Sequence, residues 1–326
     1  MSPVIDIRDL HVRFKGERIV HALNGVDISL AQGEVLGLLG ESGSGKSVTL
    51  RALLRMLPAH RTDIGGTITV AGQDVMTLQG EALEQLRGGT VSMIFQEPML
   101  ALDPVYTIGD QIAEAVVKHE KVSHADGRKR ALEMLERVRI PSPKRRLDAY
   151  PHEMSGGMRQ RAMIALALAC KPKVLLADEP TTALDATVQI QILLLLRELQ
   201  REFGMAVIFV THDIGVAVEI SDRIAVMYAG RIVESGTLRQ VVKTPSHPYT
   251  RGLLSSTLHG ARRGQRLEAI PGAPPRLDQR PVGCGFAPRC SQFSAQCSIE
   301  TIPFVDVARG HAVRCVKAQA ETVASG

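Results

Sequence analysis

The chain lacks tryptophan, and aromatic residues make up only 3% of its 326 residues. Proteins that bind single-stranded nucleic acid stack the bases on aromatic side chains, so this composition argues against such a surface. Basic residues outnumber acidic ones by only 39 to 34, which gives a net charge of +5. An excess of this size is typical of a solvated protein surface, so we expect no nucleic-acid partner.

Long hydrophobic runs are also absent. The longest, over residues 162–170, is far shorter than the roughly 18 residues that indicate a membrane span. The first residues, MSPVIDIRDLHVRF, carry charges inside their apolar pattern and lack the apolar stretch of a secretory signal. We therefore expect a soluble chain in the cytoplasm, whose 44% of apolar residues can form a substantial core.

Cysteine is scarce and unevenly distributed. Of five cysteines, Cys170 lies in an apolar segment typical of core packing, and four lie within the last 43 residues: Cys284, Cys290, Cys297 and Cys315. A reducing cytoplasm disfavours disulfides, and these four lack the closely spaced pair usual in structural zinc sites. A [4Fe–4S] cluster takes four cysteines and suits wider spacing. Arg289 and Arg314 lie next to Cys290 and Cys315, and we expect them to favour thiolates there. We predict this cluster, with Zn²⁺, or free or disulfide-linked thiols, as the alternatives.

The hydrophobic pattern predicts alternating strands and helices. Short strands are expected within residues 4–39, a hairpin around Ala71-Gly72, and helices over 108–140 and 158–170. The apolar runs KVLLAD and AVIFVTHD suit buried parallel strands. Between these runs lies a long helix that ends at Gly204. This order predicts an α/β fold with a parallel sheet.

The segment GESGSGKS at 40–47 matches the phosphate-loop pattern G-x-x-x-x-G-K-[ST]. Its glycines let backbone N–H groups surround phosphate oxygens, and the start of the following helix adds a positive dipole. We expect Lys46 to reach the β- and γ-phosphates and Ser47 to bind Mg²⁺. The predicted nucleotide contacts are Gly40, Glu41, Ser42, Gly43, Ser44, Gly45, Lys46, Ser47 and Val48.

Two other strand ends carry candidate catalytic groups. Asp178 ends the run KVLLAD and is expected beside Mg²⁺, and Glu179 follows it. A carboxylate at that point can orient or deprotonate the attacking water. His212 follows the run AVIFVT, at the edge where open α/β sheets bind ligands, so we predict a contact with the γ-phosphate and water. Gln96 in IFQEP is a weaker candidate, because a lone glutamine is also typical of an ordinary loop.

A second phosphate-binding helix start is predicted far from the first. Residues 154–161, MSGGMRQR, precede the apolar helical segment. One chain cannot fold both sites around one nucleotide if this motif lies in a separate helical lobe.

The order GESGSGKS, FQEP, MSGGMRQR, VLLADEP, ALD and VTHD resembles the nucleotide-binding subunit of an ABC transporter over about residues 4–240. The resemblance implies that Gln96 senses Mg²⁺ and the membrane partner. It implies that Glu179 is the catalytic glutamate and His212 the switch histidine. It places Asp185 in the D-loop and aligns Phe14 with the aromatic residue that stacks on adenine. The implied Mg²⁺ ligands are Ser47, Gln96 and Asp178.

In that family, two cassettes pair head to tail, and each ATP lies between one chain's phosphate loop and the other chain's signature. The resemblance therefore implies that the partner's ATP contacts Ser155, Gly156, Gly157 and Met158. The usual first and fifth signature residues are Leu and Gln, whereas Met154 and Met158 stand here. The SGG sequence that binds the anion is intact.

A finer resemblance extends over nearly the whole chain. The segments YPHEMSGGMRQRAMIALALACKPKVLLADEPTTALD, MYAGRIVESG and HPYTRGLL, with the cysteine-containing tail, are similar to the ATPases of dipeptide/oligopeptide/nickel importers. Some members carry a [4Fe–4S] cluster. The resemblance implies an ATPase on the cytoplasmic face of the inner membrane that powers peptide import. Its implied partners are a paralogous ATPase in a heterodimer, two transmembrane permeases and an extracytoplasmic substrate-binding protein.

Other substrates and other functions stay open at this point. Nickel, glutathione or another small solute are alternatives to peptide within the same machinery. A non-transport ABC ATPase is disfavoured, because such proteins usually have two cassettes or a large insertion. A P-loop kinase or GTPase would lack the signature.

The expected architecture is a P-loop ABC nucleotide-binding domain over residues 1–260. It would contain a RecA-like core, an antiparallel β subdomain and a helical subdomain over about 97–172. Four prolines in the thirteen residues AIPGAPPRLDQRP indicate a linker. A small cysteine-rich extension is predicted over 261–326.

Overall fold

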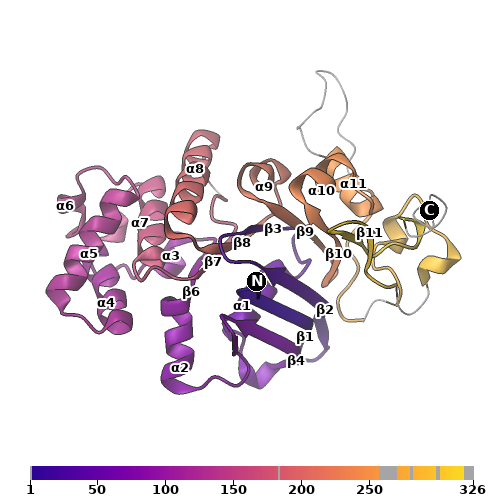
Figure 1. Cartoon of the computed structure of the whole chain (residues 1–326), viewed down its shortest axis with the longest axis horizontal. Coiled ribbons are helices and arrows are strands. Elements are labelled where there is room, and N and C mark those ends of the chain that lie inside the picture. Colours follow the sequence, from indigo (N-terminus) through magenta and orange to yellow (C-terminus); the bar gives the residue numbers. More distant parts are fainter. Residues whose placement is uncertain (1, 183, 257–269, 280–281, 299–301, 319–326) are drawn as a thin grey trace. The chain divides into compact units, whose positions relative to one another are not determined.

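The computed structural model (Figure 1) describes residues 2–182, 184–256, 270–279, 282–298 and 302–318. These residues form two compact units. The signature unit comprises the described residues of Met1–Val4, Ala31–Glu34 and Ala71–Phe209. The P-loop unit comprises those of Ile5–Leu30, Val35–Val70 and Val210–Gly326.

The P-loop unit contains an antiparallel sheet with the order β2-β1-β4. Its strands are β1 (Ile5–Phe14), β2 (Val20–Leu30) and β4 (Thr62–Val70). Ile5 lies opposite Leu30 on one side and Val70 on the other, and all three side chains are buried. The alternation of apolar and polar residues thus forms one buried face, as the period of a strand requires.

A second set of strands in the P-loop unit has the order β11-β12-β10-β9-β3. Its members are β3 (Val35–Leu39), β9 (Arg223–Tyr228), β10 (Arg231–Thr237), β11 (Val305–Ala308) and β12 (His311–Val313). β3 and β9 run parallel, and every side chain of β3 is buried. β12 pairs antiparallel with β10, so the C-terminal segment extends this sheet.

The helices of the P-loop unit are α1 (Lys46–Leu53), α9 (Ile214–Ile220), α10 (Leu238–Lys243) and α11 (Pro248–Ser255). One core cluster joins Tyr228 of β9, Tyr249 of α11 and Phe286 of the C-terminal segment. The ring centroids of Tyr228 and Tyr249 are 4.6 Å apart, and Phe286 lies 5.3 Å from the first and 5.4 Å from the second. Aromatic contacts of this kind add to the burial energy, so they fix the segment around Phe286 to this core.

The signature unit has three strands in the order β8-β7-β6. They are β6 (Val91–Ile94), β7 (Val174–Asp178) and β8 (Ala206–Thr211), whose last two residues belong to the P-loop unit. β6 and β7 run parallel, and all five residues of β7 are buried, as the sequence predicts for the run KVLLAD. The short strand β5 (Gln73–Asp74) also lies in this unit.

Four long helices dominate the signature unit (Figure 1): α4 (Ile108–Glu120), α5 (His124–Arg137), α7 (Gly156–Leu168) and α8 (Ala186–Phe203). Each begins with an N-cap residue whose side chain accepts a hydrogen bond from a backbone N–H of the first turn. These caps are, in order, Thr107, Ser123, Ser155 and Asp185. The short helices are α2 (Gly80–Glu84), α3 (Pro98–Ala101) and α6 (Pro143–Arg146).

Several predicted boundaries agree with these elements. α8 ends at Gly204 in the left-handed conformation, as predicted. The predicted helical region 108–140 is two helices, because Lys121 adopts a positive φ between them. The helix predicted over 158–170 begins at Gly156 and ends at Leu168. Within the part of the chain that the structure describes, no helix is both long and apolar enough to cross a membrane.

Candidate nucleotide and cysteine sites

The predicted phosphate loop connects β3 to α1 in the P-loop unit. Two of its glycines are required by their surroundings. A Cβ at Gly40 would lie 2.2 Å from the carbonyl oxygen of Met227, and one at Gly45 would lie 2.7 Å from Leu23 Cδ2. Gly45 also has a φ of 111°, which only glycine adopts readily. The backbone of the loop therefore packs closely against β2 and β9 of the same unit.

Lys46, the first residue of α1, is buried. Its Nζ donates to the carbonyl oxygens of Gly40 at 2.7 Å and Glu41 at 3.0 Å. The ammonium group is thus held over the loop that precedes its helix. A cation in this position suits anionic phosphate oxygens.

Glu41 of the loop is held by residues far away in the sequence. Arg289 donates from Nη1 to Glu41 Oε2 at 2.8 Å, and the backbone N–H of Glu41 donates to the hydroxyl of Tyr249 at 2.9 Å. Neither contact was predicted from the sequence. The signal that could have found them is an acidic side chain inside an anion-binding loop, which requires a nearby cation.

Phe14 and His212 are the other predicted site residues of the P-loop unit. Phe14 is half-buried at the end of β1, opposite Val20 and Thr62. His212 directly follows β8 and is exposed. The next residue, Asp213, caps α9 by accepting from the backbone N–H groups of Gly215 and Val216.

In the signature unit, β7 presents the predicted metal and catalytic carboxylates. All five side chains of β7 are buried, including Asp178 at its end. Glu179 has a φ of 46°, an unfavourable conformation for a residue with a side chain. Such backbone strain clusters at functional sites. The hydroxyl of Thr182 donates to Glu179 Oε2 at 3.1 Å, which restricts the carboxylate.

The predicted signature forms the start of α7. Ser155 is its N-cap and accepts from the N–H of Met158 at 3.4 Å, while Met154 is buried. An apolar side chain therefore suffices at 154, where the family usually has Leu. Gln160, one turn into α7, is buried and donates from Nε2 to the carbonyl oxygen of Pro180. This bond ties the signature helix to the loop after Glu179.

The remaining predicted residues of the signature unit are Gln96 and Asp185. Gln96 is exposed and lies two residues after β6. Asp185 accepts from the N–H of Val188 at 2.9 Å as the N-cap of α8. Ala183 of the predicted D-loop lies outside the described residues. The functional roles assigned to all these positions, and the domain boundary at 260/261, stay predictions.

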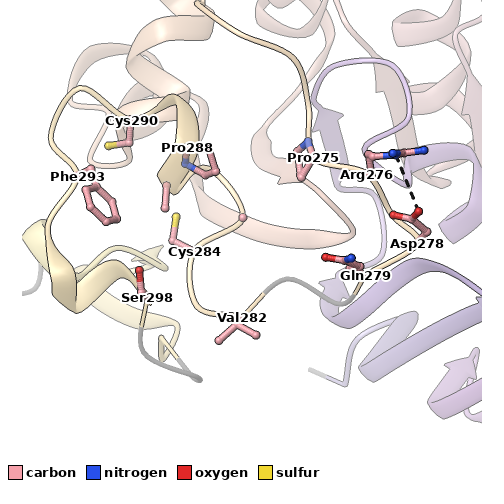
Figure 2. Close-up of a pocket in the computed structure, with 12 residues that line it drawn as sticks. Pro275, Arg276, Asp278, Gln279, Val282, Cys284, Pro288, Cys290, Phe293 and Ser298 are labelled. Carbon is pink, nitrogen blue, oxygen red and sulfur yellow. Dashed lines mark ion pairs between the residues drawn. The ribbon is translucent and has the colours of Figure 1, made fainter.

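The four C-terminal cysteines all line one small cavity in the P-loop unit. Figure 2 shows Cys284 and Cys290 on one side of a neighbouring groove, together with Phe293 and Ser298, while Arg276, Asp278 and Gln279 lie on the other side. The N–H of Cys284 donates to the carbonyl oxygen of Cys297 at 2.9 Å. Segments remote in sequence thus converge at this cavity.

Burial favours the neutral thiol at two of these cysteines, Cys284 and Cys290. Burial raises the pKa of the Cys284 thiol to about 11 and also raises the pKa of Cys290. Among the residues that the structure describes, no group of three or more His, Cys, Asp and Glu side chains is arranged to hold a metal ion.

One sequence-based interpretation of this region is wrong. Arg289 and Arg314 were expected to favour thiolates at the cysteines beside them. Arg289 instead binds Glu41. Arg314 donates to the backbone carbonyls of Ile232 and Ile302, and its guanidinium lies over the Phe304 ring. Adjacency in the sequence did not pair either cation with a sulfur, because each guanidinium is engaged by other acceptors.

Comparisons with known proteins agree with this arrangement. Residues 23–182 match the family model described as ABC transporter, and residues 233–297 match the model described as oligopeptide/dipeptide transporter, C-terminal region. A protein of Sinorhizobium fredii named a probable peptide ABC transporter ATP-binding protein is 49% identical over 96% of this chain and 94% of that protein.

Solved structures are similar as well. The ATP-binding cassette MJ0796, in a dimeric post-hydrolysis state bound to ADP and Pi, has a TM-score of 0.64 and 31% identity, over 72% of this chain and 99% of that one. The protein cbiO1 of Clostridium perfringens, part of the ABC transporter complex cbiONQ, has a TM-score of 0.64 and 28% identity, over 75% and 92% of the two chains. The predicted fold class is therefore confirmed, and the chain belongs to the ATP-binding subunits of ABC transporters that carry the oligopeptide/dipeptide transporter C-terminal region.

Proposed function

We propose that this ATPase powers the import of di- and oligopeptides across the cytoplasmic membrane. The observation that carries the proposal is the phosphate loop with its buried Lys46, in a chain whose relative of 49% identity is named for peptide transport and ATP binding. ATP is held by Phe14 at the adenine and by residues 40–48 at the phosphates. Ser47, Gln96 and Asp178 hold Mg²⁺ when it is bound.

Glu179 orients or deprotonates the attacking water, and Gln96 and His212 complete the catalytic set. The restrained carboxylate of Glu179 supports its assignment, since a catalytic base must be held in position. The constraint comes from its positive φ and from the Thr182 hydroxyl.

The signature contacts the ATP of a partner chain. Ser155 and Gly156 are exposed, and a Cβ at Gly156 would meet nothing within 4 Å among the residues that the structure describes. No described neighbour requires glycine at that position, which supports the approach of an external ligand. The N-terminus of α7 offers N–H groups and a positive dipole to the γ-phosphate of the partner's ATP. The partner is a paralogous ATPase, so the working assembly is a heterodimer.

The assembly includes two transmembrane permeases and an extracytoplasmic substrate-binding protein, and it places this chain peripherally on the cytoplasmic face of the inner membrane. The permeases and binding protein select the substrate. Nickel, glutathione or another small solute are alternative substrates of the same machinery.

The four C-terminal cysteines hold a [4Fe–4S] cluster with a structural role, and Zn²⁺ is the alternative. All four thiols line one cavity, and thiolate sulfur is the donor that such clusters use. When bound, the cluster crosslinks segments that have little core of their own.

The proposal is tested by reconstituting the chain with its permeases and second ATPase in liposomes. With the binding protein supplied, ATP-dependent uptake of a labelled peptide mixture is expected. Uptake of nickel or glutathione without any peptide uptake would contradict the peptide assignment and leave the ATPase assignment standing.

A further inference from the structure

Glu41, the second residue of the phosphate loop, is bound by an arginine of the cysteine-rich segment. Arg289 Nη1 donates to Glu41 Oε2 at 2.8 Å, and Arg289 Nη2 donates to Oε1 at 3.2 Å. A two-bond pair of this type fixes the orientation of the carboxylate as well as its position. The side chain of Arg289 is only 6% exposed and that of Glu41 25%, so solvent screens the pair less than a surface pair.

Arg289 is itself held rigidly. Besides Glu41, it donates to the hydroxyl of Tyr228 at 3.1 Å and to the backbone carbonyls of Pro271 at 2.8 Å and Ile270 at 3.3 Å. These bonds engage all its N–H donors. The guanidinium carbon also lies 5.8 Å from the centre of the Tyr228 ring and 5.9 Å from that of Phe286. Hydrogen bonding to Glu41 raises the pKa of Arg289 further, so its charge is permanent.

The backbone of Glu41 is fixed from the same side. Its N–H donates to the hydroxyl of Tyr249, a fully buried residue of α11. Its carbonyl oxygen accepts from the Nζ of Lys46. A continuous set of bonds therefore runs from Arg289 through Glu41 to the lysine predicted to contact the phosphates.

This connection has an electrostatic consequence. Glu41 places a negative charge within a loop proposed to bind a polyphosphate, and this charge would repel the phosphates. Arg289 neutralises that charge and holds the carboxylate to one side. The loop is then ready for an anion before the anion arrives.

We infer that Arg289 is a positioning residue for the nucleotide: through Glu41 it holds the phosphate loop and Lys46 in the conformation that binds ATP. The inference rests on the ATP site proposed above. Because Arg289 lies next to Cys290, the folded state of the cysteine-rich segment sets the affinity for ATP. Linkage requires the reverse effect too, so bound ATP stabilises that segment.

The test measures the dissociation constant of a fluorescent ATP analogue with Mg²⁺, on the full-length chain. Arg289→Ala is expected to raise it about tenfold, the effect of losing one charge-assisted pair. Glu41→Ala is expected to raise it about threefold, because Tyr249 still holds the backbone. The double variant is expected to bind no more weakly than Arg289→Ala, since the two changes remove one interaction. Arg276→Ala, at an arginine whose side chain is 82% exposed, is the matched control and should bind as the wild type does.

Two further measurements distinguish a positioning role of Arg289 from a purely structural role. For Arg289→Ala, KM for ATP should rise while kcat at saturating ATP stays within about twofold. In the wild type, ATP should slow hydrogen exchange of residues 284–298, and Arg289→Ala should abolish this effect. Arg289→Lys retains the charge without the two-bond geometry. Its affinity for the ATP analogue should lie between that of the wild type and that of Arg289→Ala.

The outcomes are distinct. A wild-type chain that binds no nucleotide overturns the proposed ATP site and the inference with it. A wild type that binds ATP, together with an unchanged dissociation constant in Glu41→Ala or in a folded Arg289→Ala, overturns the inference alone. Because Glu41→Ala leaves the other bonds of Arg289 in place, it decides the matter even if Arg289→Ala does not fold.

Discussion

Gln160 of α7 donates a hydrogen bond to the carbonyl oxygen of Pro180, and the residue is only 2% exposed. The bond joins the helix that begins with the signature to the loop that carries Glu179. We therefore expect a change of this loop upon hydrolysis to reach the signature through a buried contact. Since the partner's ATP is proposed to bind the signature, we expect Gln160 to couple the two nucleotides of a dimer.

Replacing Gln160 by Ala tests this coupling. The substitution leaves the Pro180 carbonyl without its donor, and an unsatisfied buried acceptor costs about 1–3 kcal/mol. We expect kcat for ATP hydrolysis to fall about tenfold while ATP affinity of the isolated chain stays unchanged. Gln191→Ala is the control: this exposed residue of α8 accepts only a solvent-exposed hydrogen bond from Arg161, so the variant should retain activity. Equal activity of the two variants would show that the bond does not matter for turnover.

The cysteine cavity makes a prediction about iron. After anaerobic purification, we expect a visible absorption spectrum and about four iron and four sulfide per chain. Cys297→Ser should lose this iron and loosen the C-terminal segment, because Cys297 is a buried member of the cavity. ATP hydrolysis should change less than the iron content.

Cys170→Ser provides the matched control for that experiment. Cys170 lies two residues beyond α7 and donates from Sγ to the carbonyl oxygen of Ala115. Burial raises the pKa of its thiol to about 11, and it does not line the cavity. It should keep full iron content. A colourless wild-type chain with one zinc and no iron would favour the alternative metal.

Residues 97–125 are predicted to contact a permease. Within this range Met99, Val105 and Tyr106 are exposed, with 43%, 70% and 58% of their surface accessible. Cysteines placed at these three positions should crosslink to a permease in the assembled complex. The wild type controls for native thiols, and Lys144→Cys, on the exposed face of α6, controls for position. Failure of all three sites to crosslink would count against this docking surface.

The sequence predicted most of the elements because their signals are local. The glycine and lysine pattern of the phosphate loop, the apolar run ending at Asp178 and the cap at Gly204 each depend on neighbouring residues. The bond between Arg289 and Glu41 spans 248 positions, so no local pattern reveals it. The same reason explains the wrong prediction for Arg289, which was assigned to the adjacent cysteine although its partner comes from another segment.

The chain is proposed to hydrolyse ATP with Glu179 as the base, within a pair of cassettes. The most direct measurement compares ATP turnover and sedimentation for the wild type, Glu179→Gln and Lys46→Ala, each with the partner ATPase. Turnover by Glu179→Gln should fall about 10²-fold or more, and ATP should trap it as a closed dimer, because shape is kept while the base is lost. Lys46→Ala should lose ATP affinity and form no such dimer. Full turnover by Glu179→Gln, without a trapped dimer, would contradict the account.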